Sequence, residues 1–197
     1  MSDFWIYFQI GFRYILNTSN YTHLVFLLVV GLPYMFRDWK KILILVTLFT
    51  VSYLSTLFLS FIDIITVKTT YLKLLSSVII LFMALYVIVS SGKGTKNNTF
   101  GVIEFLVLFF GAVSGFLFSG FYETLVSKSS EKIIPMFKIA VGIESAQIVV
   151  ISVSFVLALL FQNFLKFSRR DWIISMSFLA IGMILPSIIQ GGFLNIK

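Results

Sequence analysis

The chain has 197 residues, of which 59% are hydrophobic and 12% charged, and its mean hydropathy is +1.03. Soluble domains are about 45–50% apolar and about 25% charged, so this composition excludes a soluble globular protein. The formal net charge is +7, but the basic residues gather in short polar segments such as RDWKK (37–41) and KFSRRD (166–171), which favours lipid headgroups over nucleic acid as their counterpart. There are no cysteines, which excludes disulfides, thiolate metal sites and a cysteine nucleophile.

The first 16 residues predict an amphipathic helix. In a helix over this segment, Trp5, Phe8, Phe12 and Ile15 fall on one face. Helices with such a face bind in the plane of the membrane interface. We therefore expect residues 1–16 to lie at the membrane surface.

Six membrane-spanning helices are expected to follow, in one all-α bundle that makes residues 1–197 a single polytopic membrane domain. The apolar runs reach about 20 residues, enough to cross a hydrocarbon core of ~30 Å. Polar segments rich in Gly, Ser, Asn and charge, such as SGKGTKNNT (91–99), separate them. The predicted spans cover 21–36, 41–62, 70–90, 100–120, 135–165 and 171–191.

Lysine and arginine residues indicate the orientation only through their local density. The loops after the first, third and fifth spans hold eight of them and the opposite side holds seven, a margin too small to decide the orientation. The two densest segments, RDWKK and KFSRRD, lie on the same side, and positive charge favours the cytoplasm. We expect both termini on the outer face of a bacterial inner membrane.

The fifth span contains GIESAQ (142–147). A glutamate within a span is expensive, so Glu144 is expected to face the bundle interior, paired or protonated. Gln147 is three residues on and shares its helix face, while Gly142 allows another helix to approach closely. Glu144 is either a hydrogen-bonded packing residue or a functional group, and both interpretations stay open.

The fourth span contains GAVSGFLFSG (111–120). Gly111 and Gly115 form a small-xxx-small pattern that is typical of helix packing. A Ser-Gly pair on the fourth of six spans is also similar to rhomboid intramembrane proteases. Ser114 would then need a histidine base on the sixth span, and WIISMSFLAIGMILPSIIQ (172–190) has none, so we expect no enzyme.

His23 is the one histidine of the chain, at the start of the first span. A neutral imidazole suits transition metals, but a single imidazole does not make a site. Glu144, Asp63 or Gln147 would complete one only as a mixed, oxygen-rich shell. The alternative is a histidine that hydrogen-bonds a neighbouring helix.

Five stretches together resemble the HupE/UreJ family of hydrogenase- and urease-associated membrane proteins. They are GFRYILNTSNYTHLVFLL (11–28), DWKKILILVTLFTVSYLSTL (38–57), FFGAVSGFLFS (109–119), GIESAQ (142–147) and RRDW (169–172). The resemblance spans nearly the whole chain, in the family's order. It implies a permease for nickel or a related metal.

The histidines of the family's metal motifs are mostly replaced in this chain. Three of those positions read Tyr14, Tyr53 and Ser114, and the acidic residue that precedes His23 in the family reads Thr22. Neutral hydroxyls are poor ligands for nickel, copper or zinc. The resemblance therefore implies a degenerate metal site in which His23 and Glu144 are the remaining candidate ligands.

Two functions remain open from the sequence. One is a divergent permease for a metal cation or a small solute, with an outward-facing pocket. The residues expected around that pocket are Tyr14, Thr22, His23, Tyr53, Ser114, Glu144 and Gln147. The other is a non-transporting subunit or scaffold that binds a membrane protein or a second copy of the chain. A bound divalent metal is possible under the first hypothesis, and no other cofactor is expected.

Overall fold

The computed structural model describes residues 3–17, 21–61, 68–91, 100–126, 133–164 and 166–193. The described chain is helical and contains no strand, which confirms the predicted all-α class. Five of its helices are long and apolar enough to cross a membrane. They are α3 (Trp39–Phe61), α4 (Thr69–Ser90), α5 (Phe100–Val126), α6 (Ile134–Phe164) and α7 (Arg169–Phe193).

The first predicted span, 21–36, is shorter in the structure than expected, because its helix ends at Gly31, and the helix predicted over residues 1–16 precedes it. These two short helices are α1 (Asp3–Leu16) and α2 (Tyr21–Gly31). The 11 residues of α2 reach only about 16 Å at 1.5 Å per residue, too short to cross a bilayer alone. The helix ends before Pro33 because proline cannot continue it and disfavours helical backbone in the residue before it. A short 3₁₀ helix, η2 (Phe36–Asp38), then leads into α3.

The fourth predicted span is longer than expected. We expected it to end at Gly120, but α5 continues to Val126. The added turns carry Tyr122 and Val126, which are both buried in the core. Burial of these apolar side chains offsets the low helix propensity of Gly120.

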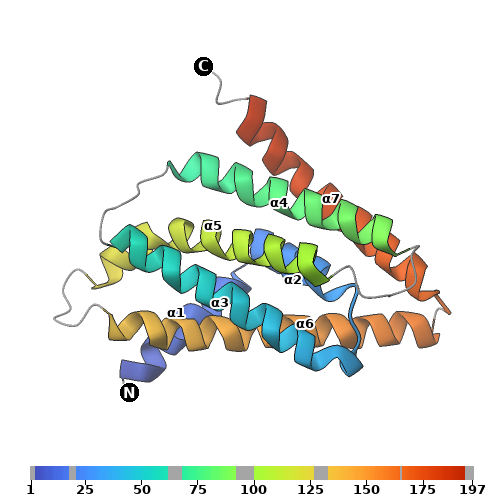
Figure 1. Cartoon of the computed structure of the whole chain (residues 1–197), viewed down its shortest axis with the longest axis horizontal. Coiled ribbons are helices and arrows are strands. Elements are labelled where there is room, and N and C mark those ends of the chain that lie inside the picture. Colours follow the sequence, from blue (N-terminus) through green and yellow to red (C-terminus); the bar gives the residue numbers. More distant parts are fainter. Residues whose placement is uncertain are drawn as a thin grey trace.

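The long helices alternate in direction between the two ends of the molecule (Figure 1). The starts of α1, α4 and α6 and the ends of α3, α5 and α7 lie toward the left in that view. The main packing pairs are α3 with α5, α1 with α6, and α4 with α7. The first and last described residues therefore both lie toward the left in Figure 1.

Two of these pairs approach each other through glycines. A Cβ on Gly111 would lie 2.7 Å from the Phe49 carbonyl oxygen, and one on Gly115 would lie 2.5 Å from that of Tyr53. These contacts bring the backbones of α3 and α5 together, as small residues do in membrane bundles. In the same way, Gly142 of α6 lies directly against the backbone of α1 at Phe8.

The N-terminal helix packs against the bundle instead of standing apart from it. Ile15 is fully buried, while Trp5 is 45% exposed. Trp5, Phe8 and Phe12 do share a face, since Phe8 stacks on the rings of both others. Ile15 lies only about 20° from Phe8 around the helix and is buried. Gly142 of α6 touches the backbone at Phe8 and Phe12, so this face of α1 lies against the bundle.

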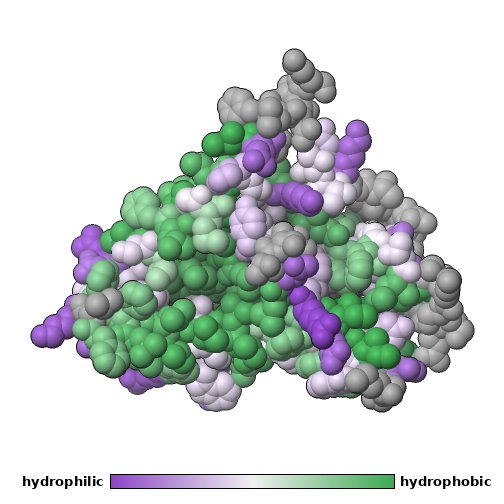
Figure 2. Space-filling model, turned by 180° about the vertical axis from the view of Figure 1, so that it is seen from behind, coloured by the Kyte–Doolittle hydropathy of each residue, from purple (hydrophilic) through white to green (hydrophobic). Residues whose placement is uncertain are grey.

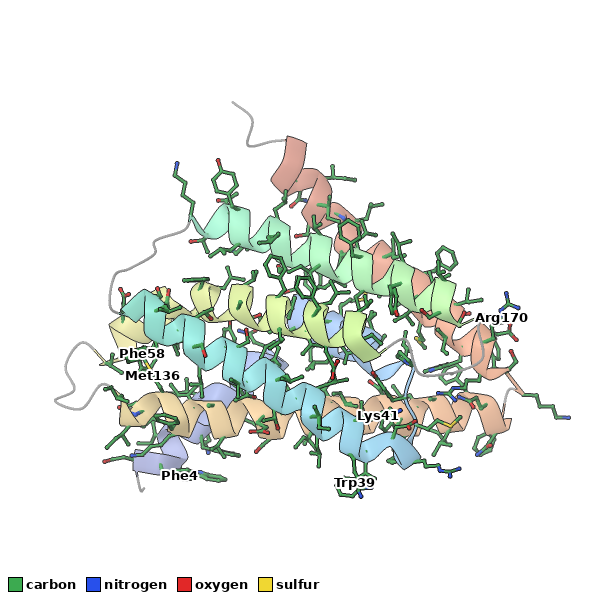
Figure 3. All side chains as sticks on the ribbon, in the orientation of Figure 1. Phe4, Trp39, Lys41, Phe58, Met136 and Arg170 are labelled. Carbon is green, nitrogen blue, oxygen red and sulfur yellow. The ribbon has the colours of Figure 1, made fainter. Side chains whose placement is uncertain are left out.

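The outer surface of the bundle is suited to lipid. Large apolar side chains project from all five long helices, and Figure 2 shows wide hydrophobic areas separated by a band of hydrophilic residues. Exposed members include Val51, Phe58, Phe82, Phe105, Phe137 and Phe178. The two charged residues labelled in Figure 3, Lys41 and Arg170, both lie toward the right of the bundle in that view.

Candidate solute cavity

A cavity of about 620 Å³ lies at the end of the bundle that collects the chain ends. Five helices line it: α1, the start of α2, the start of α4, the end of α5 and the end of α7. Its lining residues are Ile10, Arg13, Tyr14, Asn17, Tyr21, Thr22, His23, Thr69, Lys73, Ser76, Leu117, Phe121 and Ser187. Most of these residues carry a polar group, so the cavity brings polar groups together within an apolar bundle.

The local sequence explains why the cavity forms between α1 and α2. Both helices are apolar, but α1 ends at Leu16 and α2 begins at Tyr21. The intervening NTSN has the Asn and Ser/Thr side chains that compete with the backbone for hydrogen bonds and favour turns. The first turn of α2 therefore starts beside the cavity and presents Tyr21, Thr22 and His23 to it.

His23 lies at the inner wall of this cavity and is only 3% exposed. Its ring makes edge contacts with Tyr14, at 5.2 Å between centroids, and with Phe110, at 5.5 Å. Tyr14 in turn contacts Phe118 at 4.5 Å. Aromatic rings thus hold the imidazole on two sides.

Tyr53 and Ser114 lie in the same aromatic cluster but do not line the cavity. The Tyr53 ring lies 5.8 Å from that of Phe118. Ser114 is one helical turn from both Phe110 and Phe118, and its hydroxyl donates to the Phe110 carbonyl at 2.7 Å. The structure therefore gathers Tyr14, His23, Tyr53 and Ser114 around one face of α5. The Ser114 hydroxyl is bonded within its own helix, which gives no support to a nucleophile there.

Glu144 and Gln147 lie apart from the cavity lining. Glu144 is partly exposed and its Oε1 accepts a hydrogen bond from Thr47 of α3 at 3.2 Å. Our expectation that Glu144 points into the bundle interior is therefore not met. Positions three apart differ by about 60° around a helix, which leaves Glu144 at the edge of the α3–α6 contact. Gln147 is fully buried, and its amide has no hydrogen-bond partner among the described residues.

These positions do not form a transition-metal shell. Among the described residues, no three His, Asp or Glu side chains come together as a group able to hold a metal ion. The two remaining candidate ligands, His23 and Glu144, are separated, since only His23 lines the cavity. A tyrosine hydroxyl ordinarily loses its proton only at about pH 10, so Tyr14 is a neutral phenol and a poor partner for a divalent cation.

The sequence analysis did not predict several of the residues that line the cavity. Arg13, Lys73, Ser76 and Ser187 come from α1, α4 and α7, far apart along the chain. Each looked like an ordinary polar residue near a helix end. The packing of α4 against α7, marked by a 3.1 Å hydrogen bond between the Ser77 and Ser187 hydroxyls, brings Lys73, Ser76 and Ser187 to one space, and Arg13 reaches it from α1.

A smaller cavity of about 240 Å³ lies toward the opposite end, between the end of α2, α6 and the start of α7. It is largely apolar, and the Arg169 guanidinium beside it donates to the Pro33 carbonyl at 2.5 Å. Burial, together with the nearby carboxylates of Glu104 and Asp38, raises the pKa of Tyr34 in this wall. It contains none of the predicted site residues.

The fold defines a multi-pass membrane protein with a polar cavity at one end of its helix bundle. Residues 1–189 match the family model described as HupE / UreJ protein. The chain therefore belongs to the HupE/UreJ family, which confirms the resemblance of its motifs. Searches of curated proteins and of solved structures found no match.

Proposed function

We propose that this chain is a permease of the HupE/UreJ family that admits a small polar solute through the cavity between α1 and α2. The observation that carries the proposal is the cavity itself, about 620 Å³ in volume and lined by the first turns of two helices. Ligand sites in proteins range over about 300–1,000 Å³, so the space suits a small solute. Membership of a permease-type family supports the same function.

The short N-terminal helices support a transport role. The 14 residues of α1 and the 11 of α2 span about 21 and 16 Å. In our proposal they form the first crossing together, as a discontinuous helix, which gives six crossings and places both termini on one side. Secondary transporters commonly bind their solute where such helices are interrupted. Here Asn17, which follows α1, and Tyr21, which begins α2, both line the cavity.

The proposed solute is not a bare transition-metal ion. The histidine positions of the family motifs are hydroxyls at Tyr14, Tyr53 and Ser114. Imidazole or thiolate ligands are what nickel, copper and zinc prefer, and this chain has one histidine and no cysteine. A solute bound by hydroxyl and basic groups fits the lining better. In the proposal the cavity faces outward from a bacterial inner membrane.

Uptake by proteoliposomes tests the proposal. Purified protein is reconstituted, and the initial uptake of labelled nickel, phosphate and glycerol is compared with that of empty liposomes. We expect uptake of phosphate or glycerol above the empty control and no protein-dependent uptake of nickel. Nickel uptake that is lost in His23→Ala would restore a metal permease. No uptake of any of the three would contradict the proposal and favour the non-transporting subunit, whose partner would then be sought by copurification.

A further inference from the structure

We propose that the cavity between α1 and α2 is an anion site that takes a phosphate-type oxyanion. Taking this anion as the transported solute rests on the proposed function, whereas its binding does not. The shared chemistry is a compact oxyanion, whether it belongs to a dissolved solute or to a phospholipid headgroup.

The charge of the lining is the first argument. Arg13 of α1 and Lys73 of α4 both line the cavity, and none of its described lining residues is an aspartate or glutamate. Arginine pairs with phosphate oxygens in a bidentate fork, and lysine acts as a point charge. Two cations without a compensating carboxylate favour an anion and oppose a divalent cation.

The N-termini of two helices add to the positive charge at the cavity. Residues 21–23 and Thr69 belong to the first turns of α2 and α4, and both sets line the cavity. The first N–H groups of a helix have no acceptor within it, and its N-terminus carries a partial positive charge. Two such ends at one cavity reinforce the two side-chain cations. Anions in proteins bind at helix N-termini for these reasons.

Neutral hydroxyl groups are the third feature of the lining that suits an oxyanion. Tyr14, Tyr21, Thr22 and Thr69 all place hydroxyl groups on the lining. A tyrosine hydroxyl keeps its proton at neutral pH because its ordinary pKa is about 10, so Tyr14 serves as a donor to an oxyanion and not as a phenolate that would repel one. At about 620 Å³ the cavity is large for a bare inorganic ion, which leaves room for an organic phosphate or a headgroup.

The test measures binding without transport. The thermal unfolding midpoint of the purified protein is followed in phosphatidylcholine nanodiscs against phosphate and glycerol 3-phosphate, at ionic strength matched with chloride. The same midpoint is compared between nanodiscs of phosphatidylcholine and phosphatidylglycerol. Arg13→Gln and Lys73→Gln remove one cation each. Lys68→Gln is the matched control, because Lys68 is an exposed lysine at the start of α4 that does not line the cavity.

We expect the oxyanions to raise the midpoint of the wild type and of Lys68→Gln. The half-saturating concentration should rise by about tenfold or more in each cavity variant, since hydrogen bonds to charged groups are worth that much. Lys73→Arg should restore binding, which separates lost charge from misfolding. A shift only in phosphatidylglycerol nanodiscs, sensitive to the same two variants, supports the site with a lipid headgroup as the anion.

Two results would overturn the anion site. One is the absence of any shift with either dissolved or lipid phosphate. The other is a shift that Lys68→Gln weakens as much as Lys73→Gln does, because general salt effects act on all variants alike. If phosphate does not bind but glycerol is taken up, the anion site is wrong and the permease proposal stands. If phosphate binds but no solute is taken up, the anion site stands and the permease proposal is wrong.

Discussion

Replacing Gly142 by alanine should push α1 away from the bundle. A Cβ at this position would lie 3.0 Å from both the Phe12 nitrogen and the Phe8 carbonyl carbon, and closer still to the Phe8 oxygen. All three are backbone atoms, so no side-chain rotation relieves the clash and the helices must separate by several tenths of an ångström. Overpacking of this kind costs about 1–3 kcal/mol.

Gly120→Ala on α5 is the matched control, because no described atom lies within 4 Å of a Cβ built there. Both changes gain the same ~1 kcal/mol of helix propensity, so their difference isolates the packing cost. At about 2–4 °C per kcal/mol for a chain of this size, Gly142→Ala should unfold roughly 2–12 °C below Gly120→Ala in the same detergent.

The displacement also bears on function, since α1 carries Arg13 and Tyr14 to the cavity. Gly142→Ala should therefore weaken phosphate binding, whereas Gly120→Ala should not. Equal unfolding midpoints for the two variants would refute the close α1–α6 approach.

Three further predictions concern other parts of the molecule. Gln147→Met should leave the unfolding midpoint unchanged or raised, because a buried amide without a described partner costs about 1–3 kcal/mol; a lower midpoint would show that the amide is satisfied. Arg169→Gln removes the hydrogen bond to the Pro33 carbonyl and should lower stability by about 1.5 kcal/mol in a denaturation series, whereas the exposed Arg170→Gln should change it little, and equal losses would contradict the assignment. Since the chain has no cysteine, Thr69→Cys and Arg170→Cys report the orientation: a membrane-impermeant maleimide added to whole cells should label only the first, and labelling of only the second would invert the topology.

Composition and periodicity were enough to predict the helical class and the five long helices. Runs of about 20 apolar residues have few alternatives in a membrane. The first segment was the exception, because its apolar run from Tyr21 continues past Gly31 while the chain stops being helical there. Hydropathy does not register the effect of Pro33 on the residues before it.

The residues of the candidate site could be predicted only where they belong to one recognisable sequence motif. Tyr14, Thr22 and His23 were singled out by their motif, and they share the cavity in the structure. Glu144 was expected to face inward because burying a charge needs a partner, yet a threonine on the adjoining helix supplies the partner at the bundle's edge. Arg13 and Lys73 meet only through tertiary packing, which no local pattern encodes.

The most direct test of the cavity as the path of the solute is to fill it. Thr22→Phe places a ring in the cavity lining, and Thr70→Phe places the same ring on an exposed position that does not line it. Both proteins are reconstituted at equal amounts, and uptake of labelled phosphate and glycerol is measured beside the wild type. We expect Thr22→Phe to reduce uptake to the level of empty liposomes and Thr70→Phe to match the wild type. Wild-type uptake by a correctly folded Thr22→Phe would contradict the account.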